Sequence, residues 1–343
     1  MTLNGYEITG PYSDLRSELF ALDDEYLTLP SLYGARNGSI ASLGRYALNP
    51  TLDMSEGNRV IQPESPYRVD QYPTELVTDL HERITARRED LESRGYVLPD
   101  ISMIRINEGS RFGDIARYVE ALEFKNAWDD YKDVPVEKFD QEMQTEYSPY
   151  DSESRFILLL DTQNLDENEQ PILVGMARIV GGDTKLLKTV HDMPITWDVS
   201  EGSVTEDIKQ CSNTNCKNIA GIGDPAYTED YSSLAVTGDY RSSDAYPIIS
   251  HELYRWSTER NMTTITTIFV VNLLRLYRIQ GVPFRVIAGV EPRVHMGELS
   301  LPAVMHLPEV PDMLNDPKKP RAVAGYNQMA EGQGLDYVRF SVN

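Results

Sequence analysis

The chain has 343 residues, 41% of them hydrophobic, and a formal net charge of −22. This apolar fraction is enough to bury a sizeable core, and no apolar run reaches the ~18 residues that a membrane span needs. The acidic excess argues against a nucleic-acid partner, because neutralising phosphates requires clustered Lys and Arg. The first residues form neither a basic nor an apolar leader, so we expect a soluble, cytoplasmic protein.

The cysteine and histidine content argues against a disulfide framework and against a structural zinc site. The only two cysteines are Cys211 and Cys216, and the five histidines do not cluster beside them. A zinc site normally takes four such ligands. We therefore expect no metal cofactor.

Charge is unevenly distributed along the chain. Residues 120–169 hold fifteen acidic and four basic side chains, whereas residues 241–300 hold seven Arg, no Lys and five acidic side chains. An acidic partner is therefore expected to dock only on the later segment.

Residues 1–99 form an N-terminal extension to which the sequence assigns no role. No sustained period runs through residues 1–73, and an amphipathic helix is predicted over 74–94 from Leu76, Leu80 and Ile84.

Residues 100–307 alternate short strands and helices, as in a mixed α/β domain. The predicted elements, in chain order, are strand 101–106, helix 115–124, strands 156–160, 172–180 and 232–237, helix 246–260, strand 263–271, helix 273–280, and strands 284–288 and 299–307. The connection between the strands at 156–160 and 172–180 is too short for a crossover, so we expect an antiparallel hairpin. Residues 181–228 are predicted to be an irregular excursion, and residues 308–343 a C-terminal tail.

The order of these elements resembles the GNAT acyltransferase fold, and the sharper likeness is to the acyl-homoserine-lactone synthases. It is carried by Tyr246-Pro-Ile at a helix start, Trp256, the threonine-bearing strand at 264–271 with the helix after it, and residues 291–298 before the last strand. Trp256 itself is expected in the core.

Upstream segments extend this resemblance over roughly residues 100–307. Arg178 ends a segment that looks like the family's hairpin strand, Ala127-Trp128 resembles its Gly-Trp, and Tyr150-Asp151 its aromatic-Asp pair.

The resemblance implies a set of site residues. The expected substrate-binding residues are Trp128, Glu146, Asp151, Arg178, Leu234, Thr267 and Phe269. The expected catalytic residues are Asp230, Ser232 and Ser233, with Asp230 as the base and Asp151 or Glu146 binding the positive charge of the amine. A charge in the position of Arg178 must be paired or face a cleft.

This sequence departs from the family pattern at two arginines. The family has an acid, a small pair and then Arg before its fourth strand; the best match is Asp230-Tyr-Ser-Ser233, and the rival is 197–201. Ser233 or Glu201 then replaces the Arg. The Arg near the first helix is also displaced, with Arg117 and Arg111 as candidates. These departures bear on the identity of the amine, S-adenosylmethionine above all.

Acyl transfer to an amine requires a neutral amine, a thioester within attack distance and donors for the oxyanion. In the GNAT fold the fourth and fifth strands splay apart, and the pantetheine arm of the donor lies between them. Here those strands are 232–237 and 263–271, and no nucleophilic side chain is needed.

The donor is expected to be an acyl carrier protein thioester. Acyl-CoA users of this fold carry a glycine-rich loop before the next helix, whereas residues 237–246 contain one Gly and two acids, a poor cradle for a diphosphate. The arginines expected to receive the carrier protein are Arg241, Arg255, Arg275 and Arg278. The predicted function is thus transfer of a fatty acyl group to an amine, giving an acyl-homoserine lactone or an N-acyl amino acid.

Two alternatives stay open at this point. One is a non-catalytic binding protein that kept the fold, which the missing Arg and the long excursion favour. The other is an acyl-CoA-dependent N-acetyltransferase.

Overall fold

The computed structural model describes residues 2–3, 6–7, 67–127, 131, 133–166, 169–181, 187–193, 225–241, 243–270, 273–274, 277, 282–287, 293–296, 298–311 and 320–342. Trp128, Arg275, Arg278, the two cysteines and the segment 197–201 lie outside these residues. None of the helices in the described ranges is long and apolar enough to cross a membrane.

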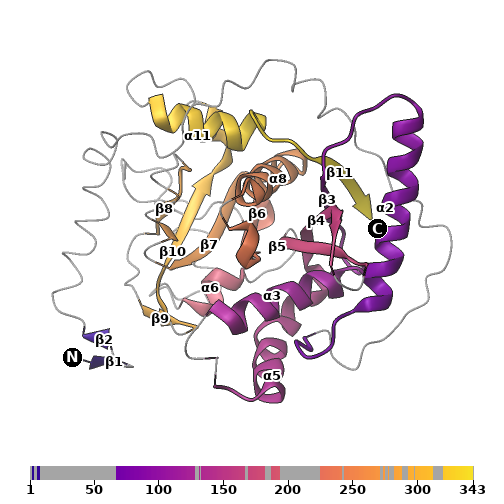
Figure 1. Ribbon diagram of the computed structural model, residues 1–343. Coiled ribbons are helices and arrows are strands. Elements are labelled where there is room, and N and C mark those ends of the chain that lie inside the picture. Colours follow the sequence, from indigo (N-terminus) through magenta and orange to yellow (C-terminus); the bar gives the residue numbers. More distant parts are fainter. Residues whose placement is uncertain are drawn as a thin grey trace.

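A nine-stranded mixed sheet forms the centre of the molecule (Figure 1). Its strands are β3 Ile101–Ile106, β4 Arg155–Leu165, β5 Pro171–Gly181, β6 Thr228–Val236, β7 Thr264–Val270, β8 Arg285–Val286, β9 Arg293–His295, β10 Glu298–His306 and β11 Val338–Val342. The order is β11-β3-β4-β5-β6-β7-β10-β8, with β9 paired to β10. A separate two-stranded sheet joins β1 Thr2–Leu3 to β2 Tyr6–Glu7.

Helices cover both faces of the large sheet. They are α2 Thr74–Ser93, α3 Gly113–Ala127, α5 Val136–Tyr147, α6 Lys188–Asp192, α8 Ala245–Glu259 and α11 Pro320–Glu331, with 3₁₀ turns η4 Ser148–Glu153, η6 Pro225–Tyr227, η7 Gly238–Tyr240 and η8 Leu307–Glu309. Side chains of α2 and α3 share one apolar core with β3 and β4, and side chains of α8 and α11 share another with β5 and β7. The central strands are therefore buried on both faces, which explains their nearly continuous apolar sequence.

The predicted hairpin and the helices predicted over 74–94, 115–124 and 246–260 are confirmed, whereas most of the predicted helix 273–280 lies outside the described residues. β4 and β5 pair antiparallel, α3 contains the predicted helix 115–124, and α8 matches the predicted helix 246–260 within a residue. Because α8 connects β6 to β7, these two strands run parallel.

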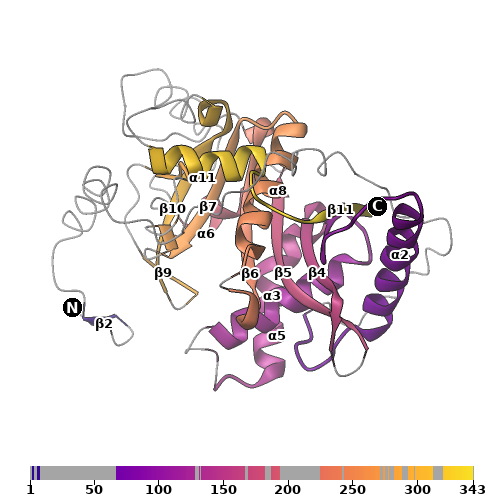
Figure 2. The same cartoon turned by 45° about the horizontal axis from the view of Figure 1, so that its top comes forward.

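The prediction of a tail at 308–343 is wrong for residues 320–342. They form α11, which packs against α8 (Figure 2), and β11, which pairs parallel with β3 (Figure 1). Alternating Val338, Phe340 and Val342 bury their side chains against the α2 side of the sheet, and this burial stabilises the strand. The domain limits at residues 99 and 307 stay a prediction, although α2 shares its core with β3 and β4.

Candidate functional site

β6 and β7 diverge in the middle of the sheet. Their pairing spans three residues of each strand and ends at Asp230 and Thr266. β6 continues to Val236 along β5, and β7 continues to Val270 along β10. Beyond Thr266 the facing edges of both strands have no ladder partner among the described residues. A sheet edge in this condition presents main-chain N–H and C=O groups to whatever extended molecule lies beside it.

Threonine hydroxyls hold the two strands together where they separate. Thr266 donates to the Asp230 carboxylate (3.0 Å) and to the Glu229 carbonyl (3.3 Å). Thr267 donates to the Tyr231 carbonyl (2.7 Å). The structure thus places Thr267, an expected substrate-binding residue, at the apex of the gap.

A β-bulge lies in β6 next to this apex. Arg178 pairs with Ser233 and Ile179 with Tyr231, so Ser232 is the extra residue. The Ser232 hydroxyl oxygen is buried and has no hydrogen-bond partner in the part of the chain that the structure describes. Bulges re-aim main-chain groups and are frequent beside active sites. The expected catalytic residue Ser232 therefore sits at the edge of the gap.

Asp230 is buried inside the paired part of β6 instead of at an open strand entrance. Its side chain accepts hydrogen bonds from the Thr189 amide (2.7 Å), the Thr189 hydroxyl (3.0 Å) and the Thr266 hydroxyl (3.0 Å). Burial raises the pKa of Asp230 to about 6, although these hydrogen bonds act in the opposite direction. The raised pKa agrees with the expected base, but the carboxylate faces α6 and not solvent.

Arg178 is fully buried and paired, as its position required. Its guanidinium donates to Glu120 (2.7 Å), to the Tyr67 hydroxyl (2.8 Å) and to Asp151 (3.1 Å). It also lies over the Tyr147 ring, 4.3 Å from the centroid. The rings of Tyr67, Tyr147 and Phe156 and two carboxylates therefore surround a single cation.

Further polar groups close this network around Arg178. Ser233 donates to Glu120, and Arg117 donates to Asp151 (3.2 Å). Burial raises the pKa of Glu120, while the charge of Arg178 lowers it. The structure thus brings Arg178, Asp151 and Ser233 together, and the sequence missed Glu120 and Tyr67 as their partners. The signal for Glu120 was a carboxylate one turn after Ala116 on the buried stripe of α3.

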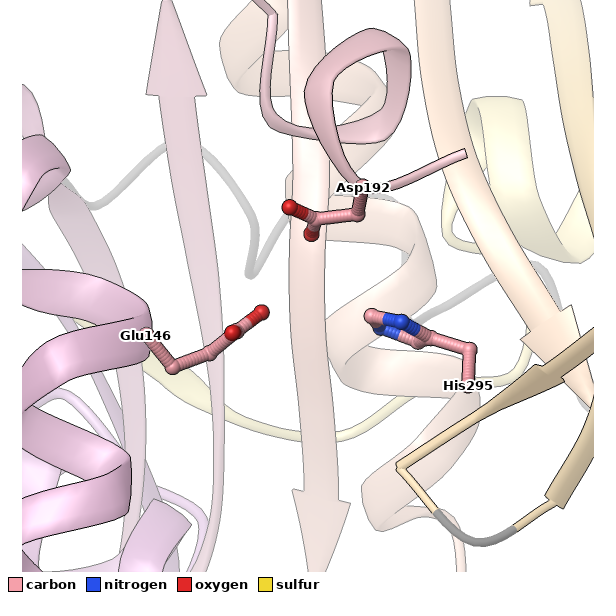
Figure 3. Close-up of side chains that lie close together, drawn as sticks. All are labelled: Glu146, Asp192 and His295. Atoms are coloured by element: carbon pink, nitrogen blue, oxygen red, sulfur yellow. The ribbon is translucent and has the colours of Figure 1, made fainter. Parts of the chain in front are cut away.

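A second polar cluster surrounds the Lys188 ammonium. Glu146 from α5, Asp192 from α6 and His295 from β9 point toward one another, with their possible ligand atoms within 4.8 Å (Figure 3). Lys188 donates to both Glu146 and Asp192 and lies 4.8 Å from the centroid of the Tyr147 ring. These carboxylates and the imidazole are donors that a divalent cation accepts, but the lysine already supplies the positive charge between the carboxylates. Of this cluster, the sequence predicted only Glu146.

A cavity of about 430 Å³ runs along α5 and borders this cluster. Its lining includes Tyr131, Phe139, Glu142, Met143, Glu146 and Met296. Its wall is therefore mixed, with aromatic and methionine side chains beside two carboxylates, a lysine (Lys138) and the polar Gln141 and Thr145.

The remaining predicted binding residues lie on the α8 side of the diverging strands. Leu234 is half-buried in β6 and Phe269 is buried in β7, where its ring is 4.5 Å from Tyr277 and 4.8 Å from Phe284. Trp256 is buried, as expected of a core residue.

The two described docking arginines both have carboxylate partners. Arg241 is exposed and pairs with Glu123 (3.1 Å), and Arg255 pairs with Glu259 (2.9 Å). An acidic partner would have to compete with these carboxylates.

The chain is remotely similar to several solved structures. No protein-family model and no curated protein matches the chain. The CoA-dependent acyl-homoserine lactone synthase BjaI, solved with SAM and isopentyl-CoA, is 12% identical over 70% of this chain and 93% of its own, with a TM-score of 0.38. TofI in a ternary complex with an inhibitor and MTA is 12% identical over 65% of this chain and 96% of its own, with a TM-score of 0.38. The spermidine N-acetyltransferase of Vibrio cholerae, with CoA and spermine, is 11% identical over 61% and 96%, with a TM-score of 0.32.

The predicted fold class is confirmed by the sheet itself. A mixed α/β sheet whose parallel central pair diverges after three residues is the arrangement expected from the sequence. Acyl-homoserine lactone synthases, the family that the sequence resembles, are among the similar structures.

Proposed function

We propose that the protein is an N-acyltransferase that moves a fatty acyl group from a thioester to an amine. The observation that supports it is the gap between β6 and β7, with two unpaired strand edges and a bulge at Ser232. A pantetheine arm is an extended chain containing amides, so it can add to a free strand edge as a peptide does. Main-chain N–H groups at the bulge then lie near the thioester oxygen, where negative charge develops.

The chemistry needs no covalent intermediate on the enzyme. The amine nitrogen attacks the thioester carbonyl carbon, the new C–N bond forms, the C–S bond breaks and the thiolate leaves. Before attack the ammonium must give one proton to a base. As the amide forms, the nitrogen loses a second proton, which the thiolate takes. The products are therefore an amide, a thiol and one proton held by the base.

In this proposal Asp230 accepts the proton of the ammonium, and Glu146 binds its positive charge. With a pKa of about 6, Asp230 is mostly ionised at neutral pH and can take a proton. Its carboxylate has used three of its roughly four acceptor positions, so the proton reaches it through the Thr266 hydroxyl. Glu146 borders the cavity and meets the positive charge of the amine.

An acyl carrier protein is the proposed donor. The turn that leads into α8 contains Asp239 and begins the helix at Asp244, so the helix start, which would attract a diphosphate, is flanked by acids. A carrier protein brings its pantetheine arm already attached and needs no diphosphate site here. A cytoplasmic location, where such thioesters are made, follows from this choice of donor.

Thiol release tests the proposal directly. Purified protein is incubated with the same acyl chain on carrier protein or on CoA, together with S-adenosylmethionine, homoserine lactone, free amino acids or alkylamines, and the products are identified by mass spectrometry. We expect thiol release and an N-acyl product with the carrier-protein thioester. Absence of release with both donors and every amine contradicts the proposal.

Two variants at the bulge test the site. Ser232→Pro removes the main-chain N–H and should abolish release, whereas Ser232→Ala removes only the hydroxyl and should lower kcat less than about tenfold, since one hydrogen bond is worth about 1 kcal/mol. Equal activity of both folded variants would mean that the main-chain N–H of Ser232 takes no part in the reaction.

A non-catalytic binding protein is the second candidate. The Asp230 carboxylate is buried against α6, and the Lys188 ammonium already neutralises Glu146, which would bind the amine. That candidate predicts binding of the acylated carrier protein in calorimetry with no thiol release over hours.

A further inference from the structure

We propose that the Lys188 ammonium occupies the position of the acceptor's own ammonium, so that α6 competes with the substrate and the acceptor is a primary alkylamine with an apolar body. This inference rests on the proposed acyl transfer. It assigns a role to Lys188, Asp192 and the cavity along α5.

The cluster is built for a primary alkylammonium, because one is already bound in it. Lys188 is 4% exposed, and its ammonium contacts the carboxylates of Glu146 and Asp192. The ammonium also lies 4.8 Å from the Tyr147 ring centroid and 5.7 Å from that of Tyr150. Two carboxylates and two aromatic rings around one cation are the usual elements of ammonium recognition.

The cluster lies next to the point where β6 and β7 separate. α6 contacts both strands, and Thr189, the residue after Lys188, binds Asp230, the last paired residue of β6. An ammonium in the Lys188 position is therefore close to the free strand edges on which the proposed thioester lies.

The cavity along α5 provides room for the rest of such an acceptor. Glu146 belongs to both the cavity wall and the cluster, so the two adjoin at this side chain. The partly exposed Tyr131 and Met296 offer apolar contact, with the buried Phe139 and Met143 behind them. A volume of about 430 Å³ suits a small molecule.

Exchange of the two ammonium groups is physically reasonable. An incoming ammonium restores the ion pairs that Lys188 gives up, so the carboxylates are never left unpaired. Glu146 is 31% exposed, which gives the incoming group access from the cavity side. A tethered lysine acts as a competitor at a high local concentration and raises the apparent KM of the free amine.

Removing the competitor tests the inference. In Lys188→Met the side-chain volume is kept and the charge is lost. We expect the KM for n-pentylamine to fall about tenfold with kcat unchanged or higher, while Arg94→Met, which removes an exposed, ion-paired cation outside the cavity, changes KM less than about twofold. Adding Glu146→Gln to Lys188→Met should reverse the gain.

A purely structural lysine gives a different result. Lys188→Met would then lower kcat and the melting temperature and leave KM unchanged, and that outcome overturns the inference. If Lys188→Met does not fold, Lys188→Gln is measured in the same way.

Calorimetry with n-pentylamine and no acyl donor separates this inference from the proposed function. Tenfold tighter binding by Lys188→Met without thiol release would support the ammonium site and contradict the transferase. Thiol release by the wild type with equal amine binding in all variants would support the transferase and contradict the inference.

Discussion

The Arg178 network and the Lys188 cluster lie side by side and both contact the Tyr147 ring, yet they differ in access. Arg178 is fully buried, as is its partner Glu120, whereas Lys188 is paired with the partly exposed Glu146 beside a cavity. Both place a cation between carboxylates and aromatic rings. We infer that the Arg178 network is structural, because no other molecule can reach its carboxylates. The Lys188 cluster is a candidate binding site, because a molecule in the cavity can reach Glu146.

Replacing the two cations by methionine measures this difference in stability. Arg178→Met leaves Glu120 buried and unpaired, so we expect the free energy of unfolding to fall by about 3–5 kcal/mol in urea titrations. Lys188→Met should cost less than about 2 kcal/mol, because water reaches Glu146 from the cavity. Equal losses would remove the proposed distinction between the two regions.

The pH dependence of stability tests the burial of Asp230. This residue binds Thr189, the neighbour of Lys188, and is the last paired residue of β6 before the gap. Burial raises the pKa of Asp230 to about 6 from 3.8, so the folded state binds the proton more tightly than the unfolded state. The contribution of Asp230 to the free energy of unfolding therefore falls as pH rises from 4 to 7. Asp230→Asn should remove this loss, which is about 2 kcal/mol. Thermal unfolding of both proteins at several pH values measures it; parallel curves would mean that Asp230 is open to water.

The smallest expected effect is at the apex of the gap. Thr267→Val removes the hydrogen bond to the Tyr231 carbonyl and should lower the free energy of unfolding by about 1 kcal/mol. Thr266→Val loses its bonds to both Glu229 and Asp230 and should cost more. If neither variant changes stability, the threonines do not hold the strands together.

The sequence could predict the gap because its two strands are marked by local pattern. Residues 232–237 and 263–271 are strand-like, and the helix between them makes the pair parallel. The start of β6 was not predicted, since Glu229 and Asp230 read as loop residues. They are tolerated in the strand because Arg155 pairs with Glu229 (2.6 Å) and the amide and hydroxyl of Thr189 bind Asp230.

The partners of the site residues could not be predicted because they come from distant segments. Tyr67 and Arg178 are 111 residues apart, and Lys188 and Glu146 are 42 apart. Only the packed sheet brings these groups together. Strand β11 did carry a signal in the alternation of Val338, Phe340 and Val342, but the Pro- and Lys-rich segment before it suggested that the fold had already ended.

Because β11 follows β3 by more than 200 residues in the chain, one edge of β3 is paired only late in synthesis. Val338 pairs with Ser102, so β3 keeps one unpaired edge throughout synthesis until residues 338–342 have been made. Until then β3 is itself the edge strand, to which another chain can add a strand, and afterwards β11 takes that place at the end of the sheet.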